Sequence, residues 1–160
     1  MSPPERVQLA LEALGLPGRV KVFDEASTHT AQEAADAVGC ELGQIVKTLF
    51  FMADGRATMA LVAGDRQVDT SALAGLLGIG RKKLKMGSPD EVLAITGFSV
   101  GGVAPVGWPQ QGDVVVDQSL RRFAEVWAAA GTSNAVFPAR TDDLVEAIHG
   151  QWASIVKEPE

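Results

Sequence analysis

The segment from residue 44 to residue 63 constrains the fold more than any other part of the sequence. Ile45 to Met52 is rich in strand-forming residues, Asp54-Gly55 is a turn signal, and Thr58 to Val62 is a second strand-like run. This pattern predicts a β-hairpin. Because both faces of the first strand are largely apolar, we expect it to be central in a sheet and covered on both sides.

Helix signals alternate with strand signals along the rest of the chain. Caps, stop glycines and apolar spacing predict helices over Pro3 to Leu14, Thr30 to Val38, Thr70 to Leu77, Ser88 to Thr96, Leu120 to Ala130 and Asp142 to Ile148. Further strands are predicted at Val20 to Phe23, Val114 to Val116, Ala135 to Phe137 and Trp152 to Val156. The hairpin argues against a purely parallel sheet. We predict an α/β (α+β) fold in which helices surround a mixed, barrel-like β-sheet.

Length and composition are those of an ordinary globular protein. With 160 residues, of which 46% are hydrophobic, we expect a single domain over residues 1–160. The single cysteine, Cys40, excludes an intrachain disulfide and a thiolate metal site, and no run of 18 apolar residues predicts a membrane span. The N-terminal residues do not resemble a signal peptide, so we expect a cytoplasmic protein. The net charge of −6 argues against a protein that coats DNA or RNA nonspecifically.

Lys47 is the most informative single residue because it interrupts an apolar strand. Lysine is rarely buried without a partner. It either extends its ammonium to the rim of the sheet, or protects an edge strand, or lies at the floor of a pocket and binds an anionic or carbonyl oxygen. The residues around Lys47 leave these interpretations open.

The segment from Phe98 to Gly107 contains the pair Gly101-Gly102 ahead of Pro105. Glycines adopt backbone angles that other residues avoid, and such a segment can direct free N–H groups at a ligand oxygen. A structural turn is the alternative. The sequence lacks a Gly-Lys-Ser/Thr step, which argues against hydrolysis of nucleoside triphosphates.

Four basic residues occur within Arg81-Lys-Lys-Leu-Lys85 of an otherwise acidic chain. Such a run is either a solvated surface or a contact for phosphates.

Other reactive groups are sparse. His29 and His149 each lie near a predicted helix end and have structural interpretations. No HExxH, CxxC or G-x-S-x-G motif occurs.

Several short motifs follow one another in a fixed order, and together they resemble one known family. They are Thr30-x-x-Glu-Ala-Ala35, Gly39, Gln44-Ile-Val-Lys-Thr-Leu49, Gly101-Gly-Val-Ala-Pro105, a strand ending at Asp117, and Ala130-Gly-x-x-x-Ala-Val-Phe137. Their order and spacing resemble the YbaK/ProX family, relatives of the bacterial prolyl-tRNA synthetase editing domain. The resemblance extends from about Val20 to Val156.

The resemblance implies a trans-editing deacylase that hydrolyses the ester of a mischarged tRNA, with tRNA(Pro) foremost, and it implies no metal or organic cofactor. Lys47 matches the central lysine of the family, and Gly101 to Pro105 matches its G-x-x-x-P loop. We expect the catalytic groups to be Lys47 and the backbone of Gly101, Gly102, Val103 and Ala104. Water is the expected nucleophile, and we expect the substrate to contact Phe23, Thr30, Thr48, Pro105, Gly131, Ser133 and Asn134.

The expected partner is the acceptor end of an aminoacyl-tRNA, bound by Arg81, Lys82, Lys83 and Lys85, and prolyl-tRNA synthetase is a candidate partner. No membrane or DNA partner is expected.

The sequence departs from the family at three positions. Branches of the family carry a serine, an aspartate and a histidine where this chain has Ala129, Val136 and Asn134, respectively. The resemblance therefore does not define the amino acid that is removed. The alternatives are a non-catalytic module that binds an aminoacyl-adenylate-like ligand, and a protein that docks onto a synthetase or ribosome.

Overall fold

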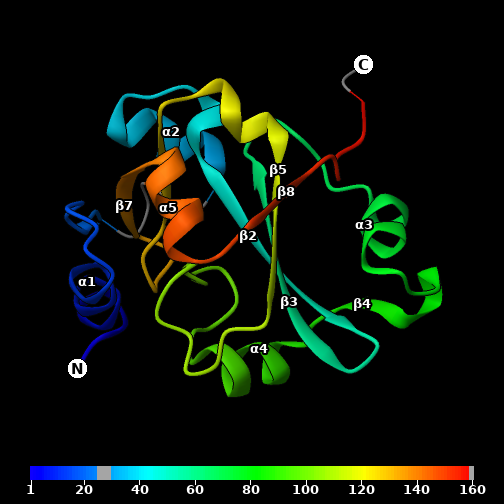
Figure 1. Cartoon of the computed structure of the whole chain (residues 1–160). Helices are drawn as coiled ribbons and strands as arrows, with labels where there is room; N and C mark the ends of the chain where they lie inside the picture. Colours follow the sequence, from blue (N-terminus) through cyan, green and yellow to red (C-terminus); the bar gives the residue numbers. More distant parts are fainter. Residues whose placement is uncertain (25–29, 159–160) are drawn as a thin grey trace.

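The predicted hairpin forms the centre of the computed structural model, which describes residues 1–24 and 30–158 (Figure 1). β2 (Val46–Ala53) and β3 (Arg56–Ala63) pair antiparallel along their whole length. Asp54 and Gly55 connect them with positive φ angles of 50° and 82°. Two consecutive positive φ values are typical of the type I′ turn, whose twist matches that of the flanking strands.

The sheet that contains the hairpin is mixed, as predicted. Its order in the described part of the chain is β4-β2-β3-β5-β8, with β4 (Leu84–Met86), β5 (Asp113–Asp117) and β8 (Gln151–Ala153) as the added strands. β5 lies parallel to β3 and β8 lies parallel to β5, whereas β2 pairs antiparallel with both of its neighbours. The prediction of an α+β fold with a mixed sheet is therefore confirmed.

A second, antiparallel sheet holds β1 (Lys21–Val22), β7 (Ala135–Arg140) and β6 (Glu125–Ala129) in the order β1-β7-β6. An isolated parallel bridge between Ile45 and Trp127 joins it to the first sheet. The strands do not close into a barrel, which differs from the barrel-like sheet that we expected. Closure stops beside β2, where the two sheets diverge around a cavity.

The prediction of a helix from Leu120 to Ala130 is wrong. This segment forms the short 3-10 helix η4 (Gln118–Arg122) and then β6. Val126 and Ala128 face the main core while Trp127 faces a smaller cluster with Ile45 and Val136. Pairing with β7 and burial on both faces outweigh the local helix preference of this alanine-rich segment.

Five predicted helices are present with nearly the expected limits: α1 (Pro3–Ala13), α2 (Ala31–Val38), α3 (Thr70–Leu77), α4 (Pro89–Thr96) and α5 (Thr141–Ala147). N-caps explain the agreement for the first four, because Ser2, Thr30, Asp69 and Ser88 each accept a hydrogen bond from the first turn. In Figure 1, α1 and α3 lie on opposite sides of the molecule and α4 lies below the hairpin.

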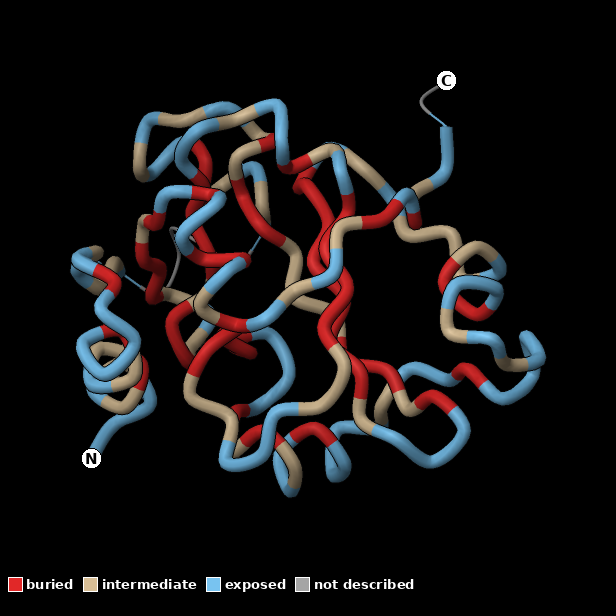
Figure 2. Tube along the Cα trace, viewed as in Figure 1, coloured by how far each residue is buried: buried red, intermediate tan, exposed pale blue. Residues whose placement is uncertain are grey.

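The core follows the central strands. Buried backbone concentrates along β2, β3 and β5, while the outer faces of α1 and α3 are exposed (Figure 2). The larger hydrophobic cluster includes Val46, Phe50 and Leu61, and a second cluster on the other face of the sheet includes Phe51, Val62 and Ile155. The strand β2 is thus covered on both sides, as its apolar sequence predicted. His29 lies outside the described residues, and His149 follows α5 with a φ of 57°.

Candidate functional site

A cavity of about 340 Å³ lies beside β2, between the two sheets. Its walls come from α2, β2, the end of β4, α4, the loop after α4, and β6 and β7. Most of the side chains on the α2, β6 and β7 walls are small and apolar, including Ala31, Ala34, Ala128, Ala129 and Val136. Thr30, Lys47, Thr48, Thr132 and Ser133 add polar groups to this apolar lining. A concave apolar site with a few convergent polar groups is the usual form of a small-ligand site.

The cavity occupies a gap in the pairing of β2. On the edge away from β3, β4 pairs with β2 only from Phe51 to Ala53, and the next contact is the bridge at Ile45. The N–H of Gly87 donates to the carbonyl of Phe50 at 3.1 Å, so the even-numbered residues of β2 direct their backbone groups to this edge. The backbone N–H and C=O of Thr48 therefore face the cavity.

The side chain of Thr48 adds a third polar group to this wall. Its Oγ1 is buried and has no hydrogen-bond partner within the described residues. A buried hydroxyl without a partner loses its hydration at a cost in free energy. The groups of this wall that face the cavity are the backbone N–H and C=O of Thr48.

Lys47 lines the cavity and is half-buried. Its Nζ donates to the backbone carbonyl of Arg66 at 2.8 Å, which leaves further donor capacity on the ammonium. The position of that carbonyl is supported by Asp65, whose carboxylate is held by two hydrogen bonds from Arg122, at 2.6 and 3.0 Å. The Arg66 guanidinium lies 3.0 Å from the same carboxylate. The pKa of Asp65 is lowered, chiefly because Arg122 donates to its charged form.

The glycine loop approaches the cavity through Gly101 and Val103, which line it, whereas Gly102 and Ala104 lie behind. Gly101 has a φ of 97°, in the region that favours glycine. A Cβ on Gly102 would lie 2.6 Å from the Cα of Thr132, so only glycine fits against this turn. The N–H of Gly102 donates to the carbonyl of Ser99 at 3.1 Å. The expectation that this amide is free for an oxyanion is therefore wrong.

Unlike Gly102, its neighbours in the loop have backbone amides that are unpaired within the described residues. No acceptor in the described part of the chain pairs with the backbone N–H of Gly101, Val103 or Ala104. Of these, Gly101 and Val103 belong to the cavity wall. They are the backbone donors that this loop offers to a bound oxygen.

Arg6 of α1 holds both ends of the glycine loop. Its guanidinium donates to the carbonyls of Thr96, Gly97 and Gly107 at 2.5, 3.2 and 3.0 Å. It also lies over the ring of Phe98, 4.0 Å from the ring centroid. A residue from the N-terminal helix thus fixes the frame of a segment about 90 residues away, which no sequence pattern indicated.

The structure brings six of the predicted site residues to the cavity wall: Thr30, Lys47, Thr48, Gly101, Val103 and Ser133. Other predicted contacts have structural partners instead. Asn134 donates to the carbonyl of Phe23 at 2.8 Å and accepts from the hydroxyl of Thr132 at 2.7 Å. Gly131, with a φ of 98°, belongs to the same turn. Pro105 lines a different cavity, of about 260 Å³, between α1 and Trp108.

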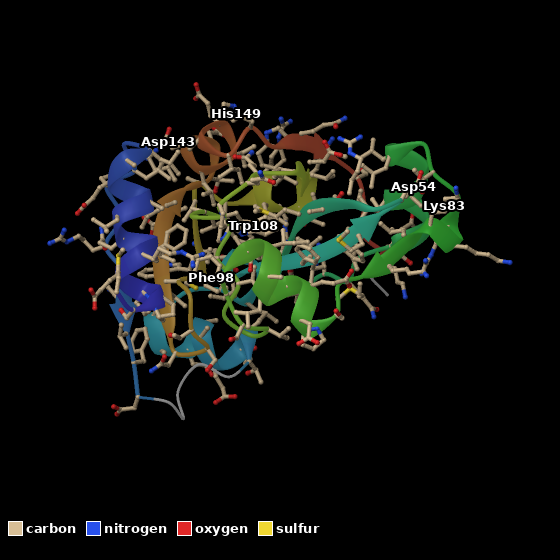
Figure 3. The ribbon with its side chains drawn as sticks, turned by 90° about the horizontal axis from the view of Figure 1, so that it is seen from below. Asp54, Lys83, Phe98, Trp108, Asp143 and His149 are labelled. Carbon is tan, nitrogen blue, oxygen red and sulfur yellow. The ribbon has the colours of Figure 1, made fainter. Side chains whose placement is uncertain are left out.

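The basic run lies at one end of the molecule, beyond the cavity. Arg81–Lys83 form the 3-10 helix η3, and Lys85 belongs to β4. Lys83 lies 3.6 Å from Asp54 at the tip of the hairpin (Figure 3), and Arg81 donates to the carbonyl of Leu84. Lys82 and Lys85 are exposed and have no ion pair within the described residues. Lys85 directly precedes Met86, which lines the cavity.

Sequence reasoning missed several cavity residues. Met86, Gly87, Val92, Val100 and Thr132 come from separate segments with no shared pattern. Ala128 was missed because its segment was predicted as a helix. Lys47 was identified because it interrupts an apolar strand, whereas Thr48 was expected only from the family resemblance.

Two further properties bear on the chemistry of the site. No cluster of three or more histidine, cysteine, aspartate or glutamate side chains suited to a metal ion occurs in residues 1–24 and 30–158. Burial raises the pKa of the Cys40 thiol, and Glu125 and Glu41 raise it further.

In the described part of the chain, none of the helices is long and apolar enough to cross a membrane.

Comparison with known proteins identifies relatives over most of the chain. The family model of the aminoacyl-tRNA editing domain matches residues 25–147. The uncharacterized protein YwhH of Bacillus subtilis (strain 168) is 34% identical over 136 residues, which cover 84% of this chain and 85% of that protein. The proline–tRNA ligase of Nitratidesulfovibrio vulgaris (strain Hildenborough) is 39% identical over 93 residues, but these cover only 16% of that enzyme.

A solved structure agrees with these sequence matches. It is provisionally assigned as a trans-editing enzyme for prolyl-tRNA synthetase, is 39% identical, and superposes with a TM-score of 0.92 over 99% of each chain. The matched family model spans α2 to α5 and so includes every wall of the cavity. The chain therefore belongs to the aminoacyl-tRNA editing-domain family.

Proposed function

We propose that this chain is a trans-editing aminoacyl-tRNA deacylase that acts in the cytoplasm on a mischarged tRNA, with tRNA(Pro) as the first candidate. The observation that carries the proposal is that one cavity gathers Lys47, the open edge of β2 at Thr48, and the free amides of Gly101 and Val103. Membership of the editing-domain family and the likeness to proteins of prolyl-tRNA charging support it.

The reaction needs modest assistance because an aminoacyl ester is already activated. Water attacks the ester carbonyl carbon, and the carbonyl oxygen becomes negatively charged. The amides of Gly101 and Val103 donate to that oxygen, and loss of one such donor typically costs about 10²–10³ in rate. The bond to the ribose oxygen then breaks, and the ribose oxygen takes the proton released by water.

Lys47 supplies positive charge to the same site. Arg66 holds its ammonium by one hydrogen bond, so two N–H groups stay available for a carbonyl, ribose or phosphate oxygen of the substrate. The small residues on the α2, β6 and β7 walls suit a small, uncharged amino-acid side chain. Outside the cavity, Lys82 and Lys85 are the members of the basic run that are free to contact the acceptor end.

A panel of mischarged tRNAs tests the proposal. Wild type should cleave at least one of Ala-, Cys- and Ser-tRNA(Pro) faster than buffer, and Lys47→Met should lower kcat/KM about tenfold or more because it removes the charge but keeps most of the side chain. Lys157→Met removes an exposed lysine outside the cavity and should leave the activity unchanged. The proposal fails if no ester in the panel is cleaved, or if Lys47→Met retains full activity.

A further inference from the structure

One hydrogen bond determines where the ammonium of Lys47 lies. A lysine side chain has several rotatable bonds, and confining it costs conformational entropy. The Nζ atom donates to the carbonyl of Arg66 at 2.8 Å, and within the described residues Lys47 forms no ion pair. A neutral carbonyl thus holds the ammonium in place, and no carboxylate compensates its positive charge.

The backbone on both sides of this carbonyl is held by hydrogen bonds. The N–H of Arg66 donates to the carbonyl of Ala63 at 2.9 Å and closes the turn 63–66. The next carbonyl, that of Gln67, accepts from the N–H of Lys157 at 2.8 Å. The peptide plane that contains the Arg66 carbonyl lies between these two anchored groups, so a shift of the turn displaces the acceptor of Lys47.

The side chain of Asp65 joins the same turn to the 3-10 helix η4. Its two carboxylate oxygens accept from the guanidinium of Arg122 at 2.6 and 3.0 Å, which is a paired, fork-like contact. Arg122 is itself held in η4, because its Nε donates to the carbonyl of Ser119 at 2.7 Å. The planar guanidinium therefore presents its fork to Asp65 in a fixed orientation.

We propose that Asp65 and Arg122 are positioning residues for Lys47 in the deacylation reaction. Their contact fixes the turn 63–66 against η4, and so fixes the carbonyl that holds the Lys47 ammonium. The inference rests on the proposed function, because it requires that this ammonium contacts the substrate. Neither residue belongs to the cavity wall, so each acts through Lys47.

The contact also keeps a negative charge away from the ammonium. The Asp65 carboxylate is shared between the guanidinium groups of Arg122 and Arg66. Asp65 directly precedes the residue whose carbonyl binds Lys47, so a carboxylate released by Arg122 would attract the ammonium and compensate its charge. Loss of Arg122 should therefore harm the reaction at least as much as loss of the Asp65 charge.

Substitution of the pair tests the inference on any ester that the wild type cleaves. Asp65→Asn keeps the shape of the side chain and should lower kcat/KM about fivefold. Arg122→Gln should cause an equal or larger loss, and the double variant should lose no more than the more damaging single variant, because both changes remove one contact. Asp113→Asn is the matched control, since it breaks a pair with Arg56, 3.0 Å away at the other end of β3, and should leave kcat/KM unchanged.

A second background separates positioning from a general effect on the fold. In Lys47→Met, the further change Asp65→Asn should alter kcat/KM by less than about twofold, because the group that it positions is absent. All rates are measured below the unfolding transition, so a small loss of stability does not affect them. The same fivefold loss in both backgrounds overturns the inference, and so do losses from Asp65→Asn and Arg122→Gln that multiply in the double variant.

Nuclear magnetic resonance of 13C-lysine-labelled protein gives a readout that needs no substrate. An ordered side chain keeps the two Hε protons of Lys47 distinct, whereas a mobile side chain averages them. Wild type and Asp113→Asn should show two Hε signals for Lys47, and Asp65→Asn should show one averaged signal. This result without cleavage of any ester overturns the deacylase proposal and keeps the positioning contact. Unchanged Lys47 signals in Asp65→Asn overturn the inference.

Discussion

Replacing Arg6 by alanine tests how the N-terminal helix supports the wall of the cavity. The Arg6 guanidinium connects the carbonyls at both ends of the segment 97–107 and covers the ring of Phe98. That segment carries Gly101 and Val103 on the cavity wall. Removing the side chain leaves the carbonyls of Thr96, Gly97 and Gly107 without their donor.

The contacts set the size of the effect. A hydrogen bond to a charged group contributes about 1.5–3 kcal/mol, and a cation–π contact about 0.5–1 kcal/mol at exposed sites. Because Arg6 is only partly buried, water replaces some of the lost bonds. We therefore expect Arg6→Ala to lower the free energy of unfolding by about 2–4 kcal/mol. For a chain of this length, the corresponding decrease in Tm is roughly 4–16 °C.

Urea unfolding followed by tryptophan fluorescence measures the loss, and deacylation below the unfolding transition measures the effect on the site. Arg6→Lys keeps the charge but not the planar fork, so its stability should lie between those of wild type and Arg6→Ala. Arg19→Ala is the matched control, because Arg19 is exposed and has no hydrogen bond, ion pair or ring contact within the described residues. The reasoning is refuted if Arg6→Ala unfolds within 1 kcal/mol of wild type and retains its kcat/KM.

Two further predictions concern Gly102 and Asp65. Gly102→Ala should destabilise the fold by about 1–3 kcal/mol and reduce activity, because its Cβ would lie 2.6 Å from Thr132 Cα, whereas Gly75→Ala, with open space in α3, should be neutral or stabilising by about 1 kcal/mol. Urea midpoints of the two variants check this, and equal midpoints contradict it. Asp65→Asn should cost about 1 kcal/mol at pH 7, since the pair with Arg122 is partly exposed. The folded-state pKa of Asp65 lies below its model-compound value of 3.8, so the stabilisation is present above that value and is lost as pH falls through the folded pKa. Unfolding free energies measured from pH 7 to pH 3 should therefore converge for wild type and Asp65→Asn, and a constant gap contradicts the assignment.

The features that depend on neighbouring residues could be predicted from the sequence. The cap signals located α3 and α4, and the Asp54-Gly55 turn located the hairpin, because each involves groups a few residues apart. The β6 strand could not be predicted in this way. Its conformation depends on pairing with β7 and on the burial of Trp127 against Ile45.

The same distinction applies to the site. The apolar strand around Lys47 drew attention to that residue, and the family resemblance indicated Thr48. The pairing of Gly102 with Ser99 and of Asn134 with Phe23 follows from the path of the chain in space. Arg6 and the carbonyls that it binds are about 90 positions apart. Nor did any local signal show that β4 ends early enough to leave part of β2 unpaired.

The unpaired edge of β2 has a consequence for how this binding site can change over time. The N–H and C=O of Thr48 belong to the main chain, so a point mutation alters the side chain at this position and leaves both groups in place. The small residues on the opposite wall, such as Ala129 and Val136, are free to vary in size and polarity. Under the proposed function, contacts made by these two backbone groups are therefore insulated from mutation, while the preference for one amino acid can change. A site built in this way can acquire a new selectivity through single substitutions without losing its ability to bind.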